Sequence, residues 1–258
     1  MRILLVGDVY SSKGRDILTR VLKKTRQEKQ IHFVVVNAEN IAHGNGINEK
    51  YYRFLLEQNV NVITLGNHAF KNNDIYNFID EAKNLIRPLN FPKGISGQGF
   101  VKVNYNGLKI TVFQVMGRVF SNTPLDCPFQ VTDAFLQNHP SDIYICDFHG
   151  EATSEKMAFA HYFDGRIQVI VGTHTHVQTN DARILNKGTL YMTDLGMTGA
   201  LDGVIGVVPG IIIKKLLTGL PARHDPMESG KSQFCGLIVE INDQTHKVTN
   251  FEIINVIE

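Results

Sequence analysis

The chain has 258 residues, of which 43% are hydrophobic and 20% charged, and its formal net charge is +1. These proportions are typical of a globular protein, and the near-neutral charge gives no general attraction to nucleic acid or anionic membranes. The three cysteines form no Cys-x-x-Cys motif, which fits a reducing cytoplasm better than a disulfide framework. No stretch reaches transmembrane length, and the N-terminal apolar run is too short for a signal peptide.

The first third of the chain alternates short apolar runs with amphipathic segments. Three runs rich in β-branched residues are predicted to be buried strands: 3–6, 32–36 and 61–65. Three segments have helical spacing: 15–30, 49–58 and 72–79. Ser11 or Ser12 is predicted to cap the first helix and Asn48 the second. This order of strand, loop and helix indicates βαβ units and a largely parallel sheet, an α/β fold.

The pattern changes after residue 85. Asn106-Gly107 is a strong hairpin signal, so the apolar runs on either side of it are expected to pair antiparallel. Further strands are predicted at 142–148, 167–171, 188–194, 232–240 and 247–256, and helices at 129–136 and 155–163. No domain boundary is evident, so residues 1–258 are predicted to form one domain.

Polar side chains of the kinds that bind metals directly follow five of the predicted strands. They are Asp8, Glu39, Asn40, Asn67, His68, His149, His174 and His176. Open α/β sheets bind ligands at the carboxyl ends of their parallel strands, so these side chains are expected in one cleft. Carboxylates combined with imidazoles favour manganese, iron, zinc or nickel over calcium. There are more donors than one ion needs, which favours two ions about 3.5–4 Å apart.

These ordered motifs resemble those of the calcineurin-like metallophosphoesterases, and most closely the bacterial YmdB-like proteins. The stretches that carry the resemblance cover almost the whole chain: 7–9, 37–44, 66–68, 87–92, 172–176 and 193–199. Two departures from the broader superfamily, Tyr10 in place of a histidine and Glu39 in place of an aspartate, are shared by the YmdB-like proteins. The resemblance implies two mixed β-sheets packed as a sandwich flanked by helices, the αββα metallophosphoesterase fold.

The resemblance also implies an activity, hydrolysis of phosphate esters and in particular of 2′,3′-cyclic nucleotides such as 2′,3′-cAMP. Two divalent or mixed-valence metal ions are expected as cofactors, iron or manganese first, with zinc and magnesium as alternatives. The expected ligands are Asp8 and His176 for the first ion, Asn67, His149 and His174 for the second, and Glu39 as the bridge. Asn40 is expected to complete the first shell or to contact the phosphate. A hydroxide bridging the ions would attack phosphorus.

His68 is the predicted catalytic residue. It adjoins Asn67 but is left free of the metals, and as an imidazolium it would protonate the leaving ribose oxygen. His43 and Thr198 are candidate substrate contacts, although His43 could merely close its loop and Thr198 could lie in a tight turn. Five further histidines are predicted to be structural or exposed: His32, His139, His161, His224 and His246.

Two other functions stay open on the sequence alone. The same centre could serve a phosphomonoesterase or nucleotidase, because one dinuclear centre suits many phosphate esters. The chain could also be a cyclic-nucleotide-responsive regulatory protein in which hydrolysis is secondary. The expected partner is a small phosphate-ester or cyclic-nucleotide substrate. A membrane is not expected, and no basic aromatic stripe supports direct binding of nucleic acid. A homo-oligomer, dimer or tetramer, is left open.

Overall fold

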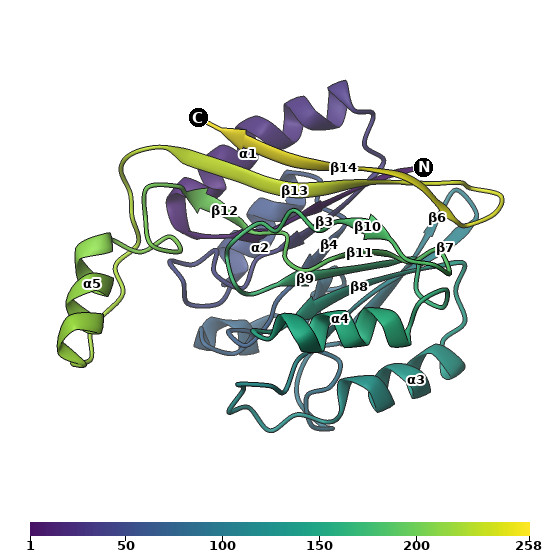
Figure 1. Ribbon diagram of the computed structural model, residues 1–258, viewed down its shortest axis with the longest axis horizontal. Coiled ribbons are helices and arrows are strands. Elements are labelled where there is room, and N and C mark those ends of the chain that lie inside the picture. Colours follow the sequence, from purple (N-terminus) through teal and green to yellow (C-terminus); the bar gives the residue numbers. More distant parts are fainter.

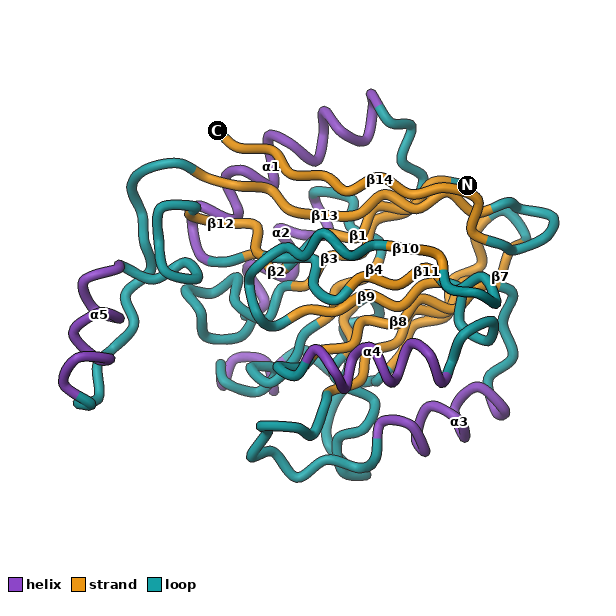
Figure 2. The backbone as a smooth tube through the Cα atoms, viewed as in Figure 1, coloured by secondary structure: helices purple, strands orange, loops and turns teal.

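Two β-sheets form the centre of the computed structural model, which describes residues 1–258, and helices cover the outer face of each sheet (Figures 1 and 2). The first sheet has the order β2-β12-β13-β1-β3-β4-β5, with β14 also paired to β13. Its strands are β1 (Arg2–Val6), β2 (Asp8–Val9), β3 (Phe33–Asn37), β4 (Val62–Thr64), β5 (Leu85–Ile86), β12 (Met197–Ala200), β13 (Ser232–Ile241) and β14 (Val248–Ile257). The predicted parallel order is confirmed for β1, β3 and β4. β5, in a stretch expected to be loop, adds one more parallel strand.

The second sheet has the order β10-β11-β9-β8-β7-β6. Its strands are β6 (Phe100–Tyr105), β7 (Leu108–Met116), β8 (Ile143–His149), β9 (Val169–Thr173), β10 (Arg183–Ile184) and β11 (Leu190–Met192). β6 and β7 form the predicted hairpin around Asn106-Gly107, where both residues have positive φ, 50° and 91°. β7, β8, β9 and β11 are parallel, so their carboxyl ends meet at one edge.

The helices lie in two outer layers. α1 (Ser11–Glu28) and α2 (Glu49–Glu57) cover the first sheet, and α3 (Pro128–Asn138) and α4 (Thr153–Tyr162) cover the second (Figure 1). A short 3-10 helix, η1 (Asn73–Asn77), follows β4. α5 (Pro209–Thr218) projects from the body and has no buried residue (Figure 1). The predicted αββα sandwich is confirmed. None of the helices has the length and apolar character needed to cross a bilayer.

The alternation of side chains along each strand divides the core into layers. In β1, Ile3 and Leu5 belong to the cluster between the two sheets, whereas Leu4 and Val6 pack in the cluster beneath the helices of the first sheet. Side chains on a strand point to opposite faces in turn, and both faces here are covered. This explains why the central strands are continuous apolar runs rather than alternating ones.

Two local predictions were wrong. The first helix begins at Ser11 rather than Arg15, and neither Ser11 nor Ser12 caps it, because the residue before the helix is Tyr10. The hydroxyl of Ser11 lies 3.1 Å from Nδ1 of His43, so it serves a tertiary contact instead. The helix predicted to run from Asn72 or Asn73 through residue 79 is only the short η1, which Asn72 caps by accepting from the Asp74 amide at 3.1 Å.

Candidate metal centre

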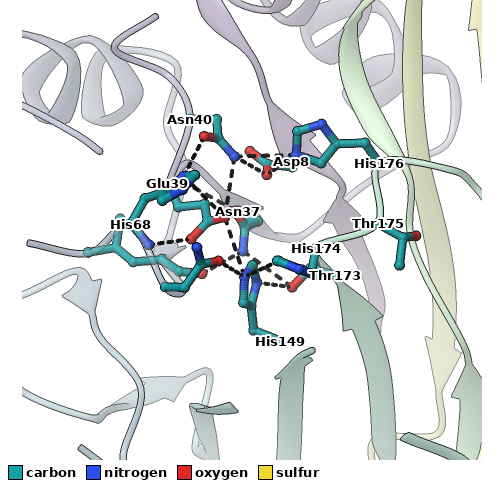
Figure 3. Close-up of polar contacts among 12 residues, drawn as sticks. Asp8, Asn37, Glu39, Asn40, His68, His149, Thr173, His174, Thr175 and His176 are labelled. Atoms are coloured by element: carbon teal, nitrogen blue, oxygen red, sulfur yellow. Dashed lines mark hydrogen bonds and ion pairs between the residues drawn. The ribbon is translucent and has the colours of Figure 1, made fainter. Parts of the chain in front are cut away.

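The predicted metal ligands meet in one cleft at the carboxyl ends of β1, β3, β4, β8 and β9 (Figure 3). The cleft has a volume of about 790 Å³, within the usual range for a small-molecule site. Its walls include both members of the His-x-His pair, together with Glu39, Asn40, Asn67 and His68. Asp8 and His149 lie beneath this surface and are fully buried.

One group of donors forms around Asp8. Its Oδ2 lies 2.9 Å from Nε2 of His176 and 2.6 Å from Nδ2 of Asn40. Nδ1 of His176 is 3.0 Å from the Ile205 carbonyl, to which it donates, so Nε2 is the nitrogen turned toward Asp8. The other oxygen of Asp8, Oδ1, is buried without a hydrogen-bond partner. Because a buried charged oxygen is costly when it has no partner, this atom fits a cation at the same place.

A second group forms around His149. Its Nε2 lies 3.0 Å from Nδ1 of His174 and 2.8 Å from Oδ1 of Asn67. One donor atom from each of Glu39, His149 and His174 lies within 4.8 Å of the others. Donors about 2.0–2.2 Å from a common ion are themselves about 3 Å apart, so the spacing and the nitrogen and oxygen chemistry both fit a transition-metal ion.

Glu39 connects the two groups. Its Oε1 lies 3.3 Å from Nδ2 of Asn40 on one side and 3.3 Å from Nε2 of His149 on the other. Burial, followed by the negative charge of Asp8, raises the pKa of Glu39 to about 8. Burial lowers the pKa of His176, but the Asp8 carboxylate outweighs it, and the pKa rises to about 9. Both groups therefore hold protons that a cation would displace.

A buried relay fixes the ring of His149. The Thr173 hydroxyl donates to Oδ1 of Asp147 at 2.7 Å and lies 2.9 Å from Nδ1 of His149. Since the hydroxyl has one proton and gives it to Asp147, it accepts from the Nδ1–H of His149. Burial also holds the pKa of His149 well below its usual value. The ring is thus neutral, with the lone pair of Nε2 directed at the donor group, as a metal ligand requires.

A buried ion pair holds the turn that carries His174 and His176. These two residues have positive φ values of 107° and 65°, which non-glycine residues adopt only when their surroundings enforce it. Nζ of Lys156, on α4, donates to the Thr173 carbonyl and to Asp194, both at 2.9 Å. Asp194 also accepts from the amide of Thr175 between the two histidines, at 3.1 Å. No pattern in the sequence indicates that this lysine is buried.

Close packing explains the glycine before Asn67. A Cβ atom on Gly66 would collide with the Glu39 carboxylate and with the ring of His149. Only glycine lets the chain after β4 pass this close to both donors, so Gly66 allows Asn67 to reach Nε2 of His149.

His68 lies beside the donors but outside both groups. Its Nδ1 is 2.8 Å from Oδ1 of Asn40, and its side chain is 28% exposed to the cleft. Burial and the nearby charge of Lys71 lower the pKa of His68 to about 4. At neutral pH the ring is therefore uncharged in the free protein, which differs from the imidazolium expected from the motif.

Of the two candidate substrate contacts, His43 lines the cleft and Thr198 does not. His43 lines the cleft with φ of 57°, and its ring contacts Ser11 rather than any metal-type donor. Thr198 is not brought to the cleft: it is fully buried in β12, and its hydroxyl accepts from the amide of Cys235 at 3.2 Å.

Several lining residues were not predicted from the sequence: Tyr10, Lys71, Glu151, Lys215, Arg223 and His224. Glu151 approaches a predicted ligand directly, with Oε2 3.1 Å from Nε2 of His174. His224, predicted to be structural or exposed, lines the cleft next to Lys215 at 3.3 Å. Lys71, Lys215, Arg223 and His224 lie on loops or on the projecting α5, away from the strand ends. Tyr10 and Glu151 do follow strands, β2 and β8, but neither was selected from the sequence as a lining residue.

With this fold and this set of donors, the protein is in the class of metallophosphoesterases. Comparisons with known proteins define the relation further. The chain belongs to the YmdB-like family: the family model described as "YmdB-like protein" matches residues 4–254. Both the predicted family and the predicted class of enzyme, a phosphoesterase, are thereby confirmed.

Three relatives span nearly the whole chain. A protein of Bacillus subtilis (strain 168) named 2′,3′-cyclic-nucleotide 2′-phosphodiesterase is 45% identical over 98% of this chain and 96% of its own. A crystal structure of a hypothetical protein from Thermus thermophilus is 38% identical, with a TM-score of 0.94 and all of both chains covered. A crystal structure described as a novel phosphatase of Mycoplasma pneumoniae is 36% identical, with a TM-score of 0.95, over 100% of this chain and 93% of the other.

Proposed function

We propose that the protein is a dinuclear metal-dependent phosphodiesterase that hydrolyses 2′,3′-cyclic nucleotides such as 2′,3′-cAMP. The observation that carries the proposal is the position of Glu39, whose single oxygen Oε1 lies 3.3 Å from a member of each donor group. The name of the Bacillus subtilis relative supports the choice of substrate. The shared core between the two sheets supports treating residues 1–258 as one domain.

The donor set divides between two ions. Asp8, Asn40 and His176 would hold one, Asn67, His149 and His174 the other, and Glu39 would serve both. Iron or manganese suits this mixture of carboxylate, amide and imidazole best, and zinc or magnesium is the alternative. When bound, the ions supply an activated water at neutral pH and neutralise charge on the phosphate.

Asn40 and His68 together provide the contact to the leaving ribose oxygen. A half-turn of the Asn40 amide exchanges its nitrogen and oxygen, which have nearly the same shape. Oδ1 then faces Asp8 and His176 as a metal ligand, and Nδ2 donates to Nδ1 of His68. The proton of a neutral His68 is then on Nε2, which can donate a hydrogen bond to the leaving ribose oxygen and stabilise the negative charge that develops there. A pKa of about 4 keeps the ring of His68 in this neutral, hydrogen-bonding form at pH 7.

The reaction consumes one water. The water oxygen forms a bond to phosphorus, the bond from phosphorus to O2′ breaks, and O2′ takes up a proton that the water releases. The product is a nucleoside 3′-phosphate. His149 and His174 stay fixed throughout, one through Thr173 and the other through the turn that Lys156 and Asp194 hold.

The variant His68→Ala tests this role of His68. We expect kcat for 2′,3′-cAMP to fall about 10²- to 10³-fold, as for loss of a hydrogen bond to the developing charge, while the metal content per chain stays unchanged. His161→Ala is the matched control, because His161 is exposed on α4, away from the cleft, and should keep full activity. Loss of metal together with activity would show instead that His68 is a ligand.

A second function is favoured by one observation, the description of the Mycoplasma pneumoniae structure as a phosphatase. A phosphomonoesterase would hydrolyse mono-aryl phosphates faster than bis-aryl phosphates, and the proposed phosphodiesterase the reverse. A regulatory protein with secondary hydrolysis would bind the cyclic nucleotide tightly in the metal-loaded state without turning it over.

A further inference from the structure

A small recess adjoins the metal centre and shares Asn67, Glu151 and His174 with the large cleft. It has a volume of about 150 Å³ and lies between the second donor group and the loop 117–123. The donor-group side is formed by Asn67, His149 and His174, and the loop side includes Val119 and Phe120. A ligand whose phosphate sits at the metal donors would therefore have the recess directly beside it.

Phe120 is unusual in two independent ways. Its side chain is 84% exposed, the largest exposure among the large hydrophobic residues of the chain, and its φ is 62°. A bulky non-glycine residue in the left-handed region carries strain, and such strain collects at ligand clamps. The chain holds this conformation without burying the ring, so folding alone does not account for it.

The base of the loop is fixed to α4. The carboxylate of Glu155 accepts from the amides of Arg118 and Val119 at 2.9 and 3.1 Å. The Ser121 amide bonds back to the Arg118 carbonyl at 3.1 Å, which closes a turn with Phe120 at its tip. The ring is thus carried on an anchored turn, and binding a ligand against it requires little further ordering of the backbone.

The size and chemistry of the recess suit one aromatic ring system. A cavity of about 150 Å³ in an engineered protein takes up one benzene molecule. Nucleobases stack on exposed aromatic side chains in proteins that bind single-stranded nucleotides. We propose that Phe120 is a stacking platform for the base of the substrate, so that the recess is the nucleobase subsite of the phosphodiesterase. This inference rests on the proposed function, since it takes the phosphate to lie at the metal donors.

The large cleft is a poorer place for the base. Its wall beyond the metal donors carries the cations Lys71, Lys215 and Arg223, whereas no lysine or arginine lines the recess. The aromatic Tyr10 also lines the cleft, but its side chain is buried. Such a wall suits water and anionic groups, whereas a base gains most from an apolar or aromatic face. The cationic wall of the cleft therefore differs from the recess, where Phe120 presents an exposed aromatic face.

Kinetic measurements on two substrates, one with a nucleobase and one without, test the proposed subsite. We expect Phe120→Ala to raise KM for 2′,3′-cAMP about tenfold with kcat unchanged, because stacking contributes equally before and during the reaction. Abasic ribose 2′,3′-cyclic phosphate should show no such loss, and Phe120→Tyr should restore KM. Leu217→Ala is the control, since Leu217 is 82% exposed on α5 and does not line either cavity. Equal losses with both substrates, or no loss with either, would overturn the inference.

A binding measurement can test the nucleobase subsite independently of the proposed phosphodiesterase activity. The chain contains no tryptophan, so the indole in Phe120→Trp is its only one. We expect adenosine 3′-phosphate, added to the metal-loaded protein, to quench that fluorescence, and abasic ribose 3-phosphate to leave it unchanged. Quenching without any hydrolysis of 2′,3′-cAMP would support the subsite and overturn the phosphodiesterase. Hydrolysis without quenching, and without a KM change in Phe120→Ala, would overturn the subsite alone.

Discussion

The cleft has a floor, the metal donors and the residues that hold them, and a rim, which includes α5. The two differ in how deeply their side chains are buried. On the floor, Asp8, His149, Lys156 and Asp194 are completely buried, and nearly every polar atom has a partner within the protein. On the rim, α5 has no buried residue, and Leu216 and Leu217 are 78% and 82% exposed. The floor thus fixes donor atoms in place, whereas the rim presents side chains to whatever enters.

Because of this difference, we expect the floor to bind the metals and the rim to contact the outer part of the substrate. Metal donors must be held to within a fraction of an ångström, which only a packed and hydrogen-bonded surrounding can do. Contacts to the outer part of a substrate tolerate motion and contribute less each. Substitutions on the floor should therefore affect stability and metal binding, and substitutions on the rim mainly KM.

The largest effect is expected for Lys156→Met, which leaves Asp194 buried without its countercharge. Breaking a buried ion pair from one side costs about 3–5 kcal/mol, so denaturant unfolding should show a loss of that size in the free energy of unfolding. Metal affinity should fall too, because the turn with His174 and His176 loses its lysine contact. Lys23→Met, at an exposed position on α1, is the control and should change stability little. A loss below about 1 kcal/mol would contradict the assigned role.

Next in size is the pH dependence of metal binding. Metal ligands must be deprotonated, and at pH 7 Glu39, with a pKa of about 8, and His176, with a pKa of about 9, hold protons in the metal-free protein. Binding should release up to two protons per chain. Affinity should rise up to about tenfold per pH unit for each proton, and should level off above the pKa of His176. Calorimetry in buffers of different ionisation enthalpy measures the release, and binding without it would show that the donors are already deprotonated.

The smallest effect is expected on the rim. Lys215→Ala removes an exposed cation from the wall of the cleft and should raise KM for an anionic substrate a few-fold, with kcat unchanged. The difference from the unmodified protein should shrink as salt is added, because exposed charges are screened. A fall in kcat, or a change in metal content, would mean that rim and floor are coupled more closely than their burial suggests.

The sequence predicts the floor better than the rim for a physical reason. Asp8, Glu39 and Asn67 each come just after an apolar strand. Parallel strands end at the same edge of the sheet, so the sequence positions of these residues predict that they lie close together. The pattern around Lys156 predicts only an ordinary helical residue, because helical periodicity cannot show that an ammonium group is buried against a carboxylate far along the chain.

The rim gives no comparable signal. α5 is not predicted from the sequence, because it stands outside the alternation of strand, loop and helix from which the earlier helices were predicted, and it buries none of its residues against a sheet. The motif around Thr198 predicts a place near the substrate, but the strand that carries this residue turns its hydroxyl to the backbone of Cys235. Which way a side chain points within a short strand depends on pairing that the sequence does not reveal.

Metal analysis of Glu39→Gln tests the central claim most directly. The unmodified protein, purified without oxygen, should contain two metal ions per chain and hydrolyse 2′,3′-cAMP. Glu39→Gln, shown to be folded by circular dichroism, should bind fewer than two ions and lose that hydrolysis, because one carboxylate serves both donor groups. A folded Glu39→Gln protein that keeps two ions and full activity would contradict the account, as would unmodified protein that is inactive when fully loaded with metal.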